Sequence, residues 1–187
     1  MAKKKQKLNV AALCGVVAAV LGIVAILMEL LTGYSVSASV LGTTSVTNYS
    51  VFDLIFGCDA TATINDNGEA VNHVNVGLLI AFILLIIGVL GSCGGAFLSL
   101  KDAKKGALVA CIASLCLIVA GILFLCTKSL TGLETGDTSK DGGIGGLIGK
   151  YGNGVKTSIG AGVYLTGIIG IVAGVADCPV VLAGFKK

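Results

Sequence analysis

The stretch Val74–Leu100, VNVGLLIAFILLIIGVLGSCGGAFLSL, contains 27 residues, and Asn75 is the only strongly polar residue among them. An α-helix rises about 1.5 Å per residue, so about 20 residues cross the hydrocarbon core of a bilayer. This stretch is therefore long enough to cross a membrane as a helix, with residues to spare for tilt. Because the strands of membrane barrels have only about 9–11 residues, the length favours a helix.

Three more apolar runs of similar length accompany this one. The first contains only Asn9 and Glu29 as strongly polar residues, the third contains no charge, and the fourth contains Asp177 as its only charge. Helices satisfy their own backbone hydrogen bonds in lipid, so we expect an all-α membrane protein, a bundle of four transmembrane helices in a single integral membrane domain. The predicted spans are 8–31, 74–100, 106–126 and 158–184, the predicted outer loops are 32–73 and 127–157, and the predicted inner loop is 101–105, within the domain 1–187.

The composition excludes several classes of protein. Of the 187 residues, 55% are hydrophobic and only 12% are charged, whereas an average soluble domain is about 25% charged. So few charges cannot cover a water-exposed surface, which excludes a soluble globular domain and a disordered chain. One His and no Trp leave few groups for acid–base or nucleophilic chemistry. We expect no catalytic residue, no cofactor and no metal site.

The basic residues, all of them lysine, set the expected orientation. Nine lie before the first span, between the second and third spans, or after the fourth, and four lie in the segment 127–157. By the positive-inside rule, this distribution predicts a multi-pass protein of the cell (plasma) membrane with both termini in the cytoplasm. Lysines beside a span are attracted to an anionic leaflet, so the net charge of +3 is explained by the lipid bilayer. No nucleic-acid partner is expected.

The first outer loop shows the alternation of a β-strand. Tyr34, Val36 and Ala38 are separated by serines, which is the period-two pattern of a half-buried strand. Further along, Asn67-Gly68 is a tight-turn signal. We therefore expect a small extracellular antiparallel β layer formed by this loop.

An apolar segment follows the β pattern in the same loop. Its hydrophobic residues are Val51, Phe52, Leu54, Ile55 and Phe56. Such a segment is unusual in a water-facing loop, and two interpretations remain open. It packs onto the ends of the helices, or it is an outer contact surface for a neighbouring protein.

The second outer loop is rich in glycine between Gly142 and Gly154. Gly149-Lys150 is similar to the end of a phosphate-binding loop, but Ile144 stands where the first glycine is needed and Tyr151 stands where Ser or Thr would bind magnesium. The segment is better interpreted as a flexible or closely packed connection, with an interfacial segment as the alternative.

The cysteines offer one candidate pair. Of the seven, only Cys58 and Cys126 lie in or beside the outer loops, where an oxidising exterior could join them. Cys58–Cys126 is therefore the disulfide candidate, and such a bond would pin the first loop to the third span. The other cysteines are typical of small apolar packing residues.

Asp177 is the acid placed deepest in a predicted span. It precedes Cys178 and Pro179, and proline removes a backbone donor and kinks a helix. We expect Asp177 to be solvated at this kink or paired with Lys104 or Lys105. Because acids inside a membrane are functional candidates by default, Asp177 is the candidate ion or proton site.

The other polar residues of the spans have simpler expected roles. Glu29 lies close to the outer end of the first span, from where its carboxylate is expected to reach the membrane interface. Asn9, Asn75 and Thr166 are expected to form hydrogen bonds between helices.

Small residues recur every four positions along the fourth span. The stripe consists of Gly162, Thr166, Gly170, Gly174 and Cys178. Gly170 and Gly174 have the GxxxG spacing that lets two helices approach closely. The stripe is a helix-packing face, either inside the bundle or between copies in a homo-oligomer or lateral assembly.

The arrangement of loops and spans resembles the claudin-like tetraspan membrane proteins. The shared features are inner termini, a long first outer loop with strand character and a shorter second one. The resemblance covers the whole chain in topology, and it implies a four-helix bundle with an outer sheet. Claudins carry a tryptophan and a cysteine pair in the first outer loop, whereas this chain has no tryptophan and only Cys58 there. Claudin barrier function is therefore not implied.

Two classes of function remain. The small-residue faces, the apolar outer segment and the scarcity of buried charge favour a non-enzymatic structural or interaction protein that self-associates or contacts an outer protein partner. The alternative is a small channel or transporter, or its accessory subunit, with a polar path near Asp177.

Overall fold

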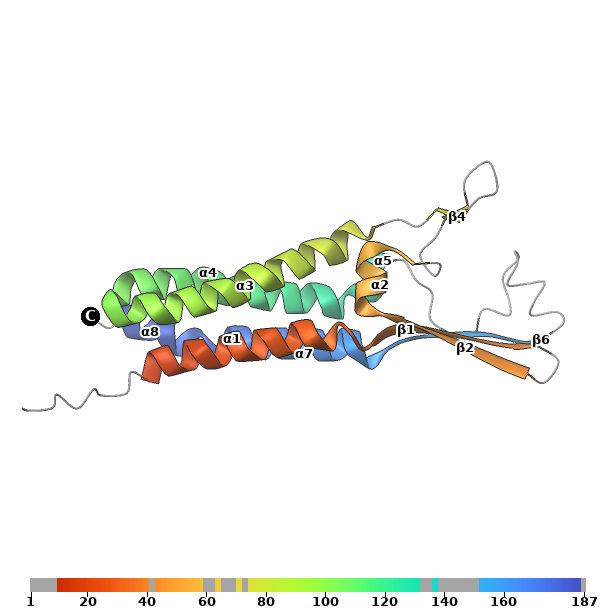
Figure 1. The fold of residues 1–187 in the computed structure, drawn as a ribbon, viewed down its shortest axis with the longest axis horizontal. Helices are drawn as coiled ribbons and strands as arrows, with labels where there is room; N and C mark the ends of the chain where they lie inside the picture. The colour runs from red at the N-terminus through yellow and green to blue at the C-terminus, as the bar shows by residue number, and fades with distance from the viewer. Residues whose placement is uncertain are drawn as a thin grey trace, which may run out of the picture. The chain divides into compact units, whose positions relative to one another are not determined.

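The structure is a computed structural model that describes residues 10–40, 43–58, 63–64, 70–71, 74–131, 136–137 and 152–185. It is mostly helical, with a small antiparallel sheet (Figure 1). The helices are α1 (Val10–Met28), α2 (Val51–Phe56), α3 (Val76–Lys101), α4 (Ala103–Leu125), α5 (Thr127–Thr131), α7 (Ala161–Ala176) and α8 (Cys178–Phe185). The strands are β1 (Thr32–Val40), β2 (Thr43–Ser50), β3 (Thr63–Ile64), β4 (Ala70–Val71), β5 (Gly136–Asp137) and β6 (Gly152–Ile159).

Three helices in the described part of the chain are long and apolar enough to cross a membrane. They are Val76–Lys101, Ala103–Leu125 and the run Ala161–Ala183, which joins α7 to most of α8. The apolar part of α1, Ala12–Met28, is shorter. The chain is therefore a helical protein whose helices suit a bilayer, as the long apolar runs of the sequence predict.

The chain divides into two compact units, and each long helix contributes to both. In the described part of the chain, the first unit contains helical segments joined by short turns: α1 up to Ala25, α3 from Phe82, α4 up to Ile122, and α7 from Ile168 together with α8. The second unit contains the remaining ends of these helices, the short helices α2 and α5, and all the strands.

Close approach between neighbouring helices holds the first unit together. A Cβ atom added at Gly91 would lie 2.8 Å from the Cβ of Ala113, and one added at Gly95 would lie 3.1 Å from the Cβ of Ala110. The partners move backwards along α4 as the glycines advance along α3, so the two helices are antiparallel. Small side chains at these positions allow the backbones to approach and gain van der Waals contact, which drives helix association in lipid.

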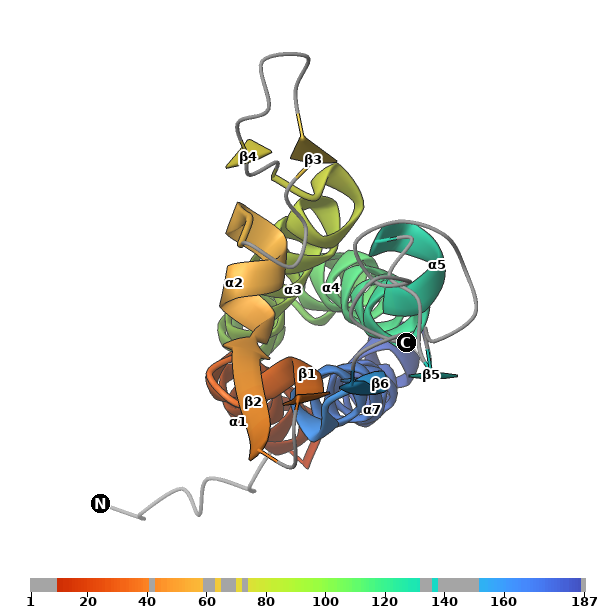
Figure 2. The same ribbon diagram turned by 90° about the vertical axis from the view of Figure 1, so that its right-hand side faces the viewer.

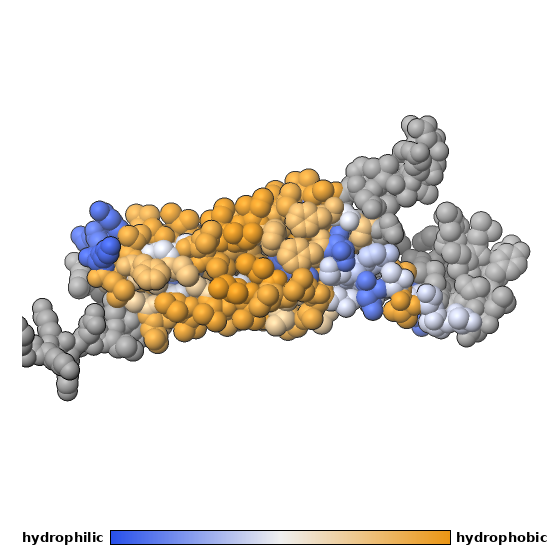
Figure 3. Space-filling view, in the orientation of Figure 1, coloured by the Kyte–Doolittle hydropathy of each residue, from blue (hydrophilic) through white to orange (hydrophobic). Residues whose placement is uncertain are grey.

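The distribution of large and small residues is the reverse of that in a soluble protein. Many fully buried positions are alanine, including Ala18, Ala81 and Ala110, whereas leucine, isoleucine and valine dominate the exposed large side chains. Figure 3 shows this directly, because the visible surface of the helices is mostly apolar, and hydrophilic colour lies at the α3–α4 turn and around α2 and the start of the sheet. A protein with such a surface would aggregate in water, whereas the same surface is suited to lipid.

The second unit contains an antiparallel sheet with the strand order β2-β1-β6-β5 (Figures 1 and 2). Central strand β1 pairs Val36 with Thr47 of β2 on one side and with Thr157 of β6 on the other. The Ser35 and Ser158 hydroxyls lie 2.9 Å apart across the β1–β6 pair. The predicted strand around Tyr34, Val36 and Ala38 is therefore confirmed, but the expectation that the first loop alone forms the sheet is wrong. Strands β5 and β6 come from the segment between α4 and α7.

A second, two-stranded ladder pairs β3 with β4, in the register Thr63 with Val71 and Ile64 with Ala70. These strands flank Asn67-Gly68, the predicted tight turn, which lies outside the described residues together with most of the glycine-rich segment 142–154.

Candidate functional site

Asp177 lies at an interruption of the last long helix. Helix α7 ends at Ala176 and α8 begins at Cys178. At the junction the Asp177 N–H donates to the Gly174 carbonyl at 3.3 Å, and the Val180 N–H donates to the Asp177 carbonyl at 3.0 Å. These are three-residue spacings instead of the four-residue spacing of an α-helix. Pro179, with no N–H to offer, explains why the helix breaks here, as the sequence predicts.

The side chain of Asp177 points into the first unit and not to water. The residue is 0% exposed, and its Oδ2 accepts a 2.8 Å hydrogen bond from the Ser92 hydroxyl of α3. Its Oδ1 is buried and has no hydrogen-bond partner in the structure. The expected solvation of Asp177 at the kink is therefore wrong, because the side chain is turned toward α3.

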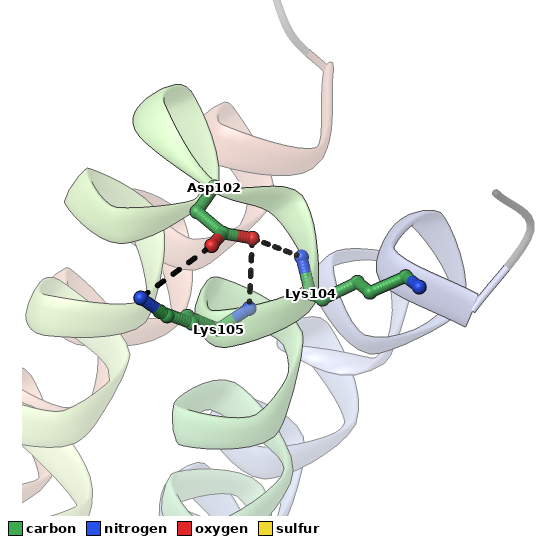
Figure 4. Close-up of polar contacts among 3 residues, drawn as sticks. All are labelled: Asp102, Lys104 and Lys105. Atoms are coloured by element: carbon green, nitrogen blue, oxygen red, sulfur yellow. Dashed lines mark hydrogen bonds and ion pairs between the residues drawn. The ribbon is translucent and has the colours of Figure 1, made fainter.

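The expected pairing of Asp177 with Lys104 or Lys105 is also wrong, because the turn between α3 and α4 has its own acid. Asp102 Oδ1 accepts from the backbone N–H of Lys104 at 3.1 Å and of Lys105 at 3.4 Å. Asp102 Oδ2 lies 3.8 Å from the Lys105 ammonium. Figure 4 shows both lysines at this turn, with the Lys104 side chain extending away from Asp102. These bonds cap the start of α4.

A second serine lies beside the same helix junction. The Ser114 hydroxyl of α4 donates to the Gly174 carbonyl at 2.8 Å, the same carbonyl that accepts from the Asp177 N–H. The Cys178 thiol reaches this carbonyl at 4.0 Å. Ser92 and Ser114 are buried, so α3, α4 and the α7–α8 junction contribute polar groups to one enclosed cluster, which we name the junction cluster: Ser92, Ser114, Gly174 and Asp177.

Glu29 is the second buried acid. It follows the last residue of α1, is 0% exposed, and has no hydrogen-bond partner on either carboxylate oxygen in the structure. Its carbonyl accepts from the N–H groups of Val51 at 3.1 Å and Phe52 at 3.4 Å. The expectation that the Glu29 carboxylate reaches the interface is therefore wrong, because the start of α2 packs against the end of α1.

The apolar segment after β2 is the short helix α2 and not a loop. A capping box begins it, because the Asp53 N–H donates to the Ser50 hydroxyl oxygen at 3.1 Å and the Ser50 N–H donates to the Asp53 carboxylate at 2.8 Å. Val51, Leu54 and Ile55 are buried. The rings of Phe52 and Phe56 stack, with their centroids 6.2 Å apart, and Phe56 is 52% exposed. Three of the five candidate outer-contact residues are therefore buried in the second unit and do not form an outer surface.

The disulfide candidate is not formed in the structure. No disulfide bond joins Cys58 to Cys126. Cys58, just after α2, is buried, whereas Cys126, between α4 and α5, is exposed. The two side chains thus face different surroundings.

The small-residue stripe of the last helix lies against other parts of the same chain. A Cβ added at Gly162 would lie 2.9 Å from the Leu31 carbonyl oxygen, and one added at Gly174 would lie 2.6 Å from Ile118 Cγ1. A Cβ added at Gly170 would lie 3.5 Å from the Cα of Gly121. Thr166 is also buried, and Cys178 is the exposed member of the stripe. Packing within the chain therefore occupies most of this face.

Asn75 links three helices. Its Oδ1 accepts from the Leu78 N–H at 3.0 Å, its Nδ2 donates to the Leu130 carbonyl of α5 at 3.1 Å, and its own N–H donates to the Ile55 carbonyl of α2 at 3.0 Å. The predicted interhelical role of Asn75 is confirmed. Asn9 lies outside the described residues.

Little in the sequence indicates that Ser92 and Ser114 would join Asp177. Each is a small residue beside glycines or alanines in an apolar run, so each fits a packing face as well as a polar cluster. A hydroxyl within an apolar span was the only signal.

Comparisons with known proteins add no family to this description. No protein-family model matches the chain, and no characterised protein matches its sequence.

Proposed function

We propose that the chain is a non-enzymatic structural and interaction protein of the cell membrane that self-associates. In this proposal α1 is a fourth span, both termini are cytoplasmic, and the sheet lies outside the cell, as in the claudin-like tetraspan proteins. The apolar outer surface of the helices supports the membrane location, and the excess of lysine on one side supports the orientation.

The observation that carries self-association is the edge strand β2. It has eight residues, and Thr43–Asn48 are exposed along it. The sheet order places β2 at an edge. Proteins protect edge strands with lysine, proline or bulges, whereas β2 has the sequence TTSVTNYS, without charge or proline.

A second copy is the partner that suits this edge. Threonine, valine and tyrosine favour strands, and two antiparallel copies of β2 centred on Val46 would pair residue 46 with residue 46 and extend the ladder over residues 43–49. The stripe on α7 does not serve this purpose, because α4 and the residues that follow α1 already lie against it. Self-association therefore rests on the sheet and not on the glycine stripe.

The test is the particle mass of the full chain in native-lipid nanodiscs, without crosslinking. We expect wild type to contain more than one copy. Val46→Lys should yield single copies, because pairing would bring two lysines together across the strands. Val46→Thr, the matched control, should assemble like wild type. A single copy of wild type, or unchanged assembly of Val46→Lys, would contradict the proposal.

A second candidate function is a small channel or transporter, or its accessory subunit, with a polar path near Asp177. The buried Asp177 at a broken helix supports it, because transporters place such groups at ion sites. Ion flux into proteoliposomes tests it, with Asp177→Asn expected to abolish flux. Flux of wild-type size in that variant would contradict a path through Asp177.

A further inference from the structure

The hydroxyl protons of the junction cluster are already used. The Ser92 hydroxyl donates to Asp177 Oδ2 at 2.8 Å, and the Ser114 hydroxyl donates to the Gly174 carbonyl at 2.8 Å. A serine hydroxyl has one proton to donate and two lone pairs to accept with. Both serine oxygens therefore present only lone pairs to any further partner.

The open oxygen of Asp177 adds to this excess of acceptors. Oδ1 is buried and without a hydrogen-bond partner in the structure. A buried carboxylate is costly unless a positive charge or donors compensate it. Because the neighbouring hydroxyls have already donated their protons, they cannot compensate Oδ1. The cluster therefore has acceptors enough, and what it needs is a positive charge.

The backbone at the junction adds one further acceptor. The partial negative charge at the end of α7 and the partial positive charge at the start of α8 meet on either side of Asp177, because α7 ends at Ala176 and α8 begins at Cys178, so the helix ends supply little net charge. Pro179 provides no N–H for the Val175 carbonyl, one turn earlier. In membrane proteins, interrupted helices of this kind hold monovalent cations with carbonyl and side-chain oxygens.

We propose that the junction cluster binds one sodium ion, held by Asp177 Oδ1 and the hydroxyl oxygens of Ser92 and Ser114. Oxygen ligands suit a hard cation. Asp177 is the one acid of the cluster, so a single positive charge neutralises it, which favours a monovalent over a divalent ion. A proton on Asp177 would neutralise the same charge but would leave the free lone pairs of both serine hydroxyls unused, whereas a sodium ion would use them. The proposal concerns binding at the site of the second candidate function, and it holds whether or not the ion crosses the membrane.

Two measurements on the full purified chain in nanodiscs test the proposal. The first is equilibrium binding of radioactive sodium, with one ion per chain expected. The second is the apparent melting temperature in sodium chloride against choline chloride, at equal ionic strength and pH. Sodium should raise the melting temperature by roughly 3–5 °C for each tenfold increase above its dissociation constant. Neither measurement depends on flux or on self-association.

Three variants locate the site. Asp177→Asn should abolish both sodium binding and the sodium-dependent rise in melting temperature. Ser92→Ala keeps the carboxylate and removes one ligand, so it should weaken sodium binding at least tenfold. Ser99→Ala is the matched control on the same helix, because the Ser99 hydroxyl bonds the Ala96 carbonyl of α3 itself, and it should bind sodium like wild type.

Several results would overturn the proposal. One is a wild type that binds no sodium and melts alike in sodium and choline. Another is a wild type whose melting temperature responds to pH alone, which would indicate a proton and not a sodium ion. If Asp177→Asn does not fold, unchanged sodium affinity in Ser92→Ala would overturn the proposed ligand set.

Discussion

Gly170 and Gly174 lie one helical turn apart on the same stripe, yet the structure gives them different tolerance for a side chain. A Cβ at Gly174 would lie 2.6 Å from Ile118 Cγ1 and 2.8 Å from the Ser114 carbonyl oxygen. A Cβ at Gly170 would meet its nearest neighbours, Gly121 Cα and the Leu117 carbonyl oxygen, at 3.5 Å, an ordinary contact distance. The GxxxG spacing alone treats the two positions as equal.

We therefore predict that substitution by alanine lowers the stability of the chain at one of the two positions and leaves it unchanged at the other. Gly174→Ala should destabilise the chain by about 1–3 kcal/mol, the usual effect of overpacking, because a backbone carbonyl cannot move aside. Gly170→Ala, the matched control, should melt within a degree or two of wild type. Thermal denaturation followed by size-exclusion chromatography measures both. Equal melting temperatures for the two variants would contradict the packing of α7 against α4.

At Asn75, the structure separates two roles of one side chain. Its Oδ1 caps the start of α3 by accepting a hydrogen bond from the Leu78 N–H. Its Nδ2 ties α3 to α5 by donating a hydrogen bond to the Leu130 carbonyl. Asn75→Ala should lose both, at a total of about 1–3 kcal/mol. Asn75→Ser should keep the cap and lose the tie. Hydrogen exchange of the Leu78 amide is the measurement, with protection lost in the alanine variant and kept in the serine variant.

Individual residues also show how far sequence reasoning extends. The sequence places Asp177 inside a long apolar run and beside a helix-breaking proline, and the structure confirms both the apolar helical run and the break. It cannot supply the partner, because Ser92 is 85 positions away and a serine beside glycines fits a packing face equally well. The shared inner end of the predicted spans suggests the lysines at 104 and 105, but Asp102 is closer to them along the chain and accepts hydrogen bonds from their backbone N–H groups.

Among the elements, α2 shows that a short local signal can end a strand even where the wider pattern of residue types favours its continuation. The β pattern of the first loop extends into Val51 and Phe52 when read by residue type alone. Ser50 and Asp53 have the spacing of a capping box, which ends β2 and starts a helix. Because both residues lie within four positions, this boundary was predictable. The pairing of β6 with β1 was not, since it joins segments more than a hundred residues apart.

The capping box of α2 gives an element-scale prediction. Asp53→Ala removes the acceptor for the Ser50 N–H and hydroxyl, which should weaken the cap by about 0.5–2 kcal/mol. The amides of Val51–Phe56 should then exchange several-fold faster with solvent. Asp102→Ala is a suitable control, because it removes the equivalent cap of α4 and should leave exchange in α2 unchanged. Faster exchange in both variants would indicate general destabilisation.

At the scale of the whole molecule, several of the largest apolar side chains in the described helices are exposed, while many alanines are buried. Leu90 is 68% exposed and Phe97 is 70% exposed, whereas Ala81 and Ala110 are fully buried. In water this arrangement would lose the hydrophobic contribution to folding. In lipid the driving force is close packing of small faces. Composition and run length correctly predict long apolar helices that suit lipid, because they depend on sums over the chain and not on particular contacts.

The orientation in the membrane is the last prediction, and α4 provides an internal comparison. Lys104 lies in its first turn and Lys128 lies just after its end, and both are exposed. The lysine distribution predicts that Lys104 faces the cytoplasm and Lys128 the exterior. A membrane-impermeant amine reagent should therefore modify Lys128 in intact cells and modify Lys104 only after permeabilisation, as read by mass spectrometry of the digested protein. The reverse pattern would invert the topology and place the sheet inside the cell. Modification of both lysines in intact cells would mean that α4 does not cross the bilayer.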